Sequence, residues 1–111
     1  MQEFKVILTW EAICDVTDIA DYIEVQFGKE RADRFQIDIN SQFKMLKTTG
    51  SIFGKSNLHY QSYSIYRKLF PPSIIFYIIK ESPKEIHILR VLREDRDWKS
   101  MLTKEQEYTY P

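Results

Sequence analysis

The chain has little of what builds a metal centre, a disulfide framework or a phosphate loop. Its 111 residues include one cysteine, so no intramolecular disulfide can form, and the Cys14 thiol is expected to be inert. Two histidines lie far apart in sequence and suggest no metal site. With only three glycines, no glycine-rich phosphate loop is present. We therefore expect neither a metal nor a cofactor.

Long apolar runs are also missing. The longest, residues 74–79, is far too short to span a bilayer and is typical of a buried strand. The first residues show no basic segment followed by an apolar run, so no signal peptide is expected. Together with the single cysteine, which suits a reducing compartment, these absences predict a cytoplasmic protein that makes no membrane contact.

Excess charge of either sign is absent too. Sixteen basic residues balance sixteen acidic ones, whereas proteins that grip nucleic acid mainly through phosphates usually carry a net positive charge. What the chain does have is apolar and aromatic material: 43% hydrophobic residues, with seven Phe, seven Tyr and two Trp. This is enough for one modest core, so residues 1–111 are predicted to form a single domain.

The first half of the chain predicts a strand followed by a helical hairpin. Residues 4–8 form a short strand that stops at Thr9, a good helix N-cap, with Glu11 in the first turn. Gly28 ends this helix, and a second helix begins at once and fades at residues 48–50. Helices joined so closely must fold back as an antiparallel pair. Their apolar stripes are Ile13, Val16, Ala20, Ile23 and Phe27, then Ala32, Phe35, Ile39, Phe43 and Leu46.

The second half predicts a meander of three antiparallel strands over residues 64–70, 73–79 and 85–93, with proline-containing turns between them. The middle strand is apolar on both sides and is expected to be central. The preceding segment, residues 48–59, is predicted to be irregular, either a binding loop or a plain connection.

A short helix over residues 95–102 and a flexible tail over residues 103–111 complete the predicted order. The fold class is therefore α+β: an N-terminal strand, an antiparallel two-helix hairpin, a three-stranded antiparallel meander and a short C-terminal helix. The hairpin is expected to cover one face of the sheet and to leave the other partly open.

Arginines stand on the predicted strands at Arg67, Arg90 and Arg93. Arginine is well suited to planar recognition of phosphate or carboxylate, so an anionic partner is expected on the open sheet face. The alternative is a solvated network in which the arginines pair with neighbouring carboxylates or with those of the first helix. Trp98 is expected to anchor the last helix, and Tyr66 to be core or part of an aromatic platform.

Five segments in a fixed order carry a family pattern: Thr9-Trp10-Glu11-Ala12, Asp18-Ile19-Ala20-Asp21-Tyr22-Ile23, Phe27-Gly28, Tyr66-Arg67, and Arg90-Val91-Leu92-Arg93-Glu94-Asp95-Arg96-Asp97-Trp98. As an ordered set they resemble the RelE/ParE superfamily of bacterial type II toxins, and the chain is most similar to the ParE-like, plasmid-stabilisation branch. The resemblance covers essentially the whole chain. It implies a toxin that forms a hetero-oligomer with a cognate antitoxin encoded beside it.

The resemblance leaves open which of two cellular targets the toxin would act on. ParE-like members poison DNA gyrase and are not thought to be enzymes, whereas RelE-like members cleave messages in the ribosomal A site. Cleavage needs groups that move protons and cations that stabilise the phosphate. The candidates here are Arg67, Arg93 and His87, but arginine is a poor general acid or base, and His87 lies in mid-strand.

We therefore favour a non-enzymatic gyrase inhibitor. The alternatives are a ribosome-dependent mRNA endonuclease and a degenerate protein that binds its antitoxin without toxicity. The residues expected to bind the target or the antitoxin are Arg67, Arg90, Arg93, Trp98 and Tyr66.

Overall fold

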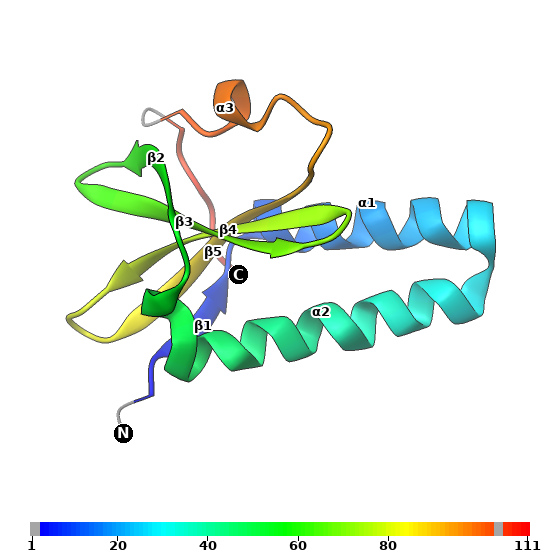
Figure 1. The fold of residues 1–111 in the computed structure, drawn as a ribbon, viewed down its shortest axis with the longest axis horizontal. Helices are drawn as coiled ribbons and strands as arrows, with labels where there is room; N and C mark the ends of the chain where they lie inside the picture. The colour runs from blue at the N-terminus through cyan, green and yellow to red at the C-terminus, as the bar shows by residue number, and fades with distance from the viewer. Residues whose placement is uncertain (1–2, 104–105) are drawn as a thin grey trace.

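Two long helices run side by side along one face of a sheet (Figure 1). The elements are β1 (Lys5–Leu8), α1 (Trp10–Phe27), α2 (Lys29–Thr49), the 3-10 turn η1 (Gly50–Ile52), β2 (Lys55–Tyr60), β3 (Tyr63–Phe70), β4 (Ser73–Lys80), β5 (Glu85–Arg93) and α3 (Trp98–Met101). The structure is a computed structural model that describes residues 3–103 and 106–111. The sheet order is β1-β5-β4-β3-β2, with β1 parallel to β5 and all other neighbours antiparallel.

The predicted α+β class and element order are confirmed, with one strand more than expected. β2 lies within residues 48–59, which the sequence predicts to be irregular. Its pairing with β3 shifts register between Lys55 and His59, and Asn57 has a φ of 70°. Ser56 is buried, with its hydroxyl donating to a β3 carbonyl at 2.7 Å. The strand therefore lacks the regular apolar alternation that would reveal it.

The ends of α1 form as the sequence predicts. Thr9 caps the helix, because its Oγ1 accepts a hydrogen bond from the Ala12 N–H at 2.9 Å. The same hydroxyl donates to the Leu89 carbonyl at 2.9 Å, which ties the helix start to β5. Gly28 sits between α1 and α2 at a φ of 99°, a conformation that favours glycine. Among the described residues, no helix combines the length and apolarity needed to cross a membrane.

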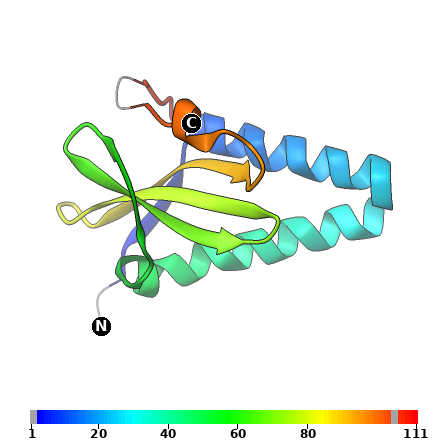
Figure 2. The same cartoon turned by 45° about the horizontal axis from the view of Figure 1, so that its top comes forward.

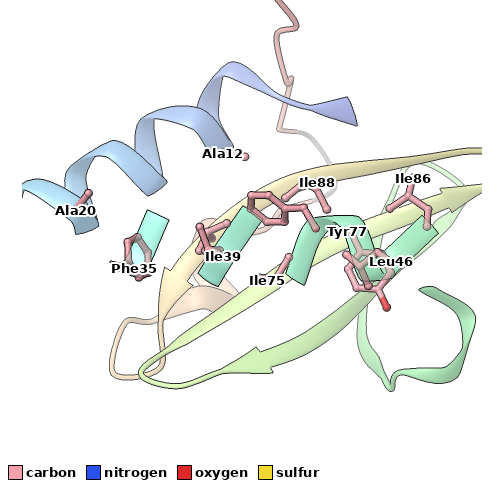
Figure 3. Packing of buried hydrophobic residues seen from close by; sticks show 11 residues of the cluster. Ala12, Ala20, Phe35, Ile39, Leu46, Ile75, Tyr77, Ile86 and Ile88 are labelled. Atoms are coloured by element: carbon pink, nitrogen blue, oxygen red, sulfur yellow. The ribbon is translucent and has the colours of Figure 1, made fainter. Parts of the chain in front are cut away.

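The main core lies between the helices and the sheet, where side chains of α1 and α2 meet those of β4 and β5 (Figure 3). Tyr77 of β4 is fully buried in this layer and stacks on Tyr66 with ring centroids 5.5 Å apart. Its hydroxyl donates to the Gly50 carbonyl at 2.6 Å, so the buried polar group is satisfied. This bond fixes the end of α2 to the centre of the sheet.

A charged contact joins α1 to β5 beyond the point where β1 ends. β1 pairs with β5 only as far as Ile88, so the edge of β5 is open after that residue. There Asp15 of α1 accepts from the Val91 N–H at 3.0 Å. Its carboxylate also accepts two bonds from the Arg90 guanidinium, at 2.7 and 2.9 Å. One side chain thus satisfies an orphan backbone donor and a partly buried cation.

The second sheet face is not as open as the sequence predicts. A second apolar cluster covers it, in which Leu102 and Tyr108 pack on Phe76 and Leu89. Trp98 lies over Phe76 with ring centroids 5.3 Å apart, so it anchors α3 on the sheet. The expectation failed because the residues that cover this face come from a polar, tyrosine-rich segment.

That C-terminal segment differs from the predicted flexible tail over residues 103–111, of which 104–105 lie outside the described residues. The predicted helix before it shortens to the single turn of α3. The chain then returns to the start of α1 (Figure 2). Tyr108 is only 8% exposed, and the Trp10 N–H donates to the Thr109 carbonyl at 2.8 Å. Both carboxylate oxygens of Glu11 accept from Thr109, one from its N–H and one from its hydroxyl.

Replacing Asp15 by Asn should leave the Arg90 cation without a counter-ion in a partly buried position. We expect D15N to lower the free energy of unfolding by about 2 to 3 kcal/mol, because an uncompensated buried charge is costly. Urea denaturation measures this. The matched control is D18N, which removes a carboxylate from an exposed position of the same helix. Equal effects of the two substitutions would contradict the stated role of Asp15.

The Glu11–Thr109 contact should respond to acid. Desolvation raises the pKa of Glu11, but hydrogen bonds from the Thr109 and Glu11 backbone N–H groups and from the Thr109 hydroxyl bring it below its ordinary value of 4.5. The carboxylate therefore stabilises the fold above pH 4.5 and loses this effect as the pH falls through the folded-state pKa. We expect E11Q to be less stable than the wild type at pH 7, with the difference in stability shrinking as the pH falls through the lowered pKa of Glu11 and lost once the carboxylate is protonated in the folded state. A difference in stability that stays the same from pH 7 down to the acid end of the titration would contradict this.

Candidate functional site

Arg67 lies on the sheet face opposite the helices, as predicted. Side chains alternate along β3: Ile65 belongs to the second cluster and Tyr66 to the main core, so Arg67 returns to the second face. It is exposed, and no ion pair involves it among the described residues. Its guanidinium is therefore free to meet an anion.

Arg93 lies on the helix side, so the expectation that it shares a face with Arg67 is wrong. β5 carries a bulge, because Tyr77 pairs with Ile88 while Phe76 pairs with Arg90, leaving one extra residue in β5. A one-residue insertion moves every later side chain to the other face. The Arg93 guanidinium is consequently centred 5.2 Å from the ring of Tyr22 on α1, and its side chain is 41% exposed.

Arg90 sits in the bulge and is committed to Asp15. The Arg90 side chain is 17% exposed, and its pKa is raised, first by the hydrogen bonds to Asp15, against the opposing effect of desolvation. The sequence left open whether Arg90 binds an anionic partner or pairs with a carboxylate. The structure shows the second: Arg90 pairs with a carboxylate of the first helix. Its Nε and Nη2 donors are both occupied, so Arg90 supports the fold rather than offering a free cation.

Tyr66 and Trp98 are half-buried. Tyr66 stacks on Tyr77 in the main core, and the Lys55 ammonium lies 5.8 Å from its ring centroid. Trp98 packs on the second face, as described above. Both rings therefore build the layers of the fold while leaving part of their surface to solvent.

His87, the candidate acid of a nuclease, is buried at 6% exposure and engaged on both ring nitrogens. Its Nδ1 lies 2.6 Å from the Tyr110 hydroxyl, and its Nε2 lies 2.9 Å from the Glu85 carboxylate. Burial raises the pKa of Tyr110 to about 12, so that hydroxyl stays protonated at neutral pH. These contacts describe a structural histidine that holds the C-terminal segment.

The three nuclease candidates do not converge. His87 and Arg93 stand six residues apart on one strand, about 20 Å at the rise of an extended chain. Arg67 and Arg93 lie on opposite faces. Nucleophile activation and phosphate stabilisation require groups within hydrogen-bond reach of one substrate, and these three residues do not provide that. The described residues also contain no cluster of three or more His, Cys, Asp or Glu side chains that could hold a metal ion.

Arg93 instead borders a groove that lies between the C-terminal half of α1, the N-terminal half of α2 and the turn that joins β3 to β4. We call it the arginine groove; its volume is about 430 Å³. Ile19, Ile23 and Phe35 contribute apolar surface to its lining. Its cationic members are Arg31, Arg34 and Arg93, and Tyr22 and Phe27 are among its aromatic ones.

Arg31 and Arg34 are available to a ligand, whereas the Arg93 guanidinium donates to the exposed Asp95 carboxylate at 3.4 Å. The Arg31 guanidinium lies 4.9 Å from the Phe27 ring centroid, in the same type of contact that Arg93 makes with Tyr22. No ion pair involves Arg31 or Arg34 among the described residues, although Asp38 also lines the groove. An apolar groove bordered by guanidinium groups suits a segment that carries both carboxylates and an apolar anchor.

Our sequence reasoning did not select Arg31 and Arg34. A signal was present, because the two arginines are three residues apart in the first turns of α2 and follow the Phe27-Gly28 pair. Residues at this spacing share one face of a helix. The rest of the groove comes from α1 and from the β3–β4 turn, and that turn is distant in sequence from the two arginines. Only the fold therefore shows that Arg31 and Arg34 border a groove.

Comparisons with known proteins agree with this architecture. A family model described as "ParE toxin of type II toxin-antitoxin system, parDE" matches residues 6–98. A solved structure described as "Chromosomal ParDE TA system from P. aeruginosa" has a TM-score of 0.66 and 25% sequence identity, over 82% of this chain and 96% of that chain. A comparison with curated proteins gave no match. The chain thus belongs to the ParE toxin family of type II toxin–antitoxin systems.

Proposed function

We propose that this chain is a toxin that acts in the cytoplasm by inhibiting DNA gyrase, and that a cognate antitoxin neutralises it in a hetero-oligomer. Membership of the ParE family supports the toxin assignment. The observation that carries the choice of target is the separation of Arg67, Arg93 and His87. Without a group placed to move a proton beside a bound phosphate, this chain would act by binding rather than by cleaving RNA.

The antitoxin is proposed to dock in the arginine groove. Arg31, Arg34 and Arg93 offer guanidinium donors beside aromatic and aliphatic surface, so the complementary segment would carry Asp or Glu residues around an apolar anchor. Because the chain has no net charge, its overall charge does not indicate the sign of a partner. The local cluster of arginines does, since it favours an acidic segment. Specificity would come from matching these charges to a particular partner.

Gyrase is proposed to contact the other face, through Arg67. This residue is exposed, is unpaired among the described residues and lies away from the arginine groove. Neutralisation would then require the antitoxin to block the target sterically or to hold the toxin in an assembly that gyrase cannot enter. Two separate surfaces make the two activities separable by mutation.

Expression of this chain alone tests the proposed target. We expect growth arrest with gyrase-dependent DNA breaks, and we expect R67E to reduce the breaks by about tenfold or more, since it reverses a contact charge. The matched control is R96E, at an exposed position beyond the sheet. Message cleavage that requires ribosomes, without DNA breaks, would replace gyrase by the ribosome as the target. Normal growth with intact antitoxin binding would indicate the non-toxic alternative.

Charge reversal in the arginine groove tests the antitoxin surface. The double substitution R34E/R93E should weaken antitoxin binding by about a hundredfold, roughly tenfold for each lost charged contact. Calorimetry measures the affinity, and K99E, at an exposed lysine of α3, serves as the control. DNA breaks caused by the free toxin should persist in R34E/R93E. Unchanged antitoxin affinity would show that the groove is not the docking surface.

A further inference from the structure

The arginine groove places cationic side chains against aromatic ones. The Arg31 guanidinium lies 4.9 Å from the Phe27 ring centroid, and the Arg93 guanidinium lies 5.2 Å from the Tyr22 ring centroid. Both rings are exposed although they are large and aromatic. Exposed aromatic rings and guanidinium planes are the surfaces on which nucleobases stack in proteins. The groove therefore offers two such surfaces to a planar ligand.

The charge of the groove favours a phosphate-bearing ligand. Three guanidinium groups and one carboxylate, that of Asp38, line it, so positive charges exceed negative ones by two. A ligand with one carboxylate would balance only half of this excess, whereas a phosphate monoester carries about −2 at neutral pH. The planar fork of a guanidinium also matches phosphate oxygens in a bidentate contact.

The three guanidinium groups can turn to a ligand without losing a buried contact. Arg31 and Arg34 are exposed, and no ion pair involves either of them among the described residues. The contact of Arg93 with Asp95 is long, at 3.4 Å, and both side chains are largely exposed. Ion pairs of this kind contribute little free energy, so a phosphate could replace the Asp95 carboxylate.

The surroundings of the groove indicate how such a ligand would lie. A neighbouring hollow, which also contains Tyr22, is lined by two carboxylates and two guanidinium groups, those of Asp15, Asp18, Arg93 and Arg96. Its charges balance, so it does not attract phosphate as the arginine groove does. The two arginines of α2 lie three residues apart and share one side of the helix. Phosphates would therefore lie on α2, with the base towards Tyr22.

We propose that the arginine groove binds a nucleotide, with its phosphates on Arg31 and Arg34 and its base stacked beside Tyr22. The volume of the groove, about 430 Å³, lies within the range of about 300 to 1,000 Å³ that is usual for small-molecule sites. Binding does not depend on the antitoxin. Because the antitoxin is proposed to use the same groove, a bound nucleotide would compete with it, and only this consequence rests on the proposed function.

Calorimetric titration of the free, full-length chain with ATP tests the site. ATP should bind at least about tenfold more tightly than adenosine or inorganic triphosphate, because each of these carries only one half of the recognised structure. Equal affinity for inorganic triphosphate would show that the groove responds to charge alone and would overturn the proposal. Tighter binding of a single-stranded oligonucleotide than of ATP would identify a nucleic-acid strand as the occupant and would also overturn it.

Substitutions in the groove should change ATP affinity in both directions. R34E should weaken binding by at least about tenfold, and R34K, which keeps the charge but loses the planar fork, by about threefold. D38N should tighten binding by about threefold, because it removes the one carboxylate of the groove, and a misfolded variant would not show such a gain. The matched control is K47E, at an exposed lysine near the other end of α2, which should bind ATP as the wild type does.

Absence of ATP binding, or equal affinities of the wild type, R34E and D38N, would overturn the nucleotide site. Either result would leave the proposed function intact, because the titration contains neither antitoxin nor gyrase.

Discussion

The bulge in β5, held by Asp15, determines where the charged side chains of the C-terminal third of the chain lie. The extra residue would leave an unpaired backbone donor at an open strand edge, and the Asp15 carboxylate accepts from that donor at Val91. The same carboxylate neutralises Arg90. Beyond the bulge, alternation is reversed, and Arg93 reaches the helix side. One interaction thus fixes the register of β5, the position of α1 and the lining of the arginine groove.

The parts of the fold that could be predicted from sequence are those with local causes. Thr9 and Gly28 mark the ends of α1 because a cap acts within a few residues, and the apolar stripes repeat at helical spacing. β2 could not be predicted in this way. Its buried Ser56 is satisfied by a bond to β3, so a long-range partner replaces the local pattern. The C-terminal segment is similar, since Thr109 has its partners on α1, far away in sequence.

The site was predicted less well than the fold, for a geometric reason. Arg67 lies in a regular ladder, so alternation placed it on the correct face. Arg93 follows a bulge, and a single inserted residue reverses the face without leaving a clear mark in the sequence. Arg31 and Arg34 belong to a groove assembled from three segments. Residue type identified the chemistry that arginine offers, but only the tertiary structure shows which arginines remain unpaired.

The contacts that hold α1 have a consequence for how the chain reaches this structure. Thr9 bonds across 80 positions to Leu89, Asp15 across 75 to Arg90, and Glu11 across 98 to Thr109. This is a topology of high contact order. The chain must lose the conformational entropy of closing long loops before the contacts between distant residues can stabilise the fold. The helical hairpin can form early from its own capping signals, yet it acquires a fixed position only when the last strand arrives. Folding of this domain should therefore be slow for its size and strongly cooperative.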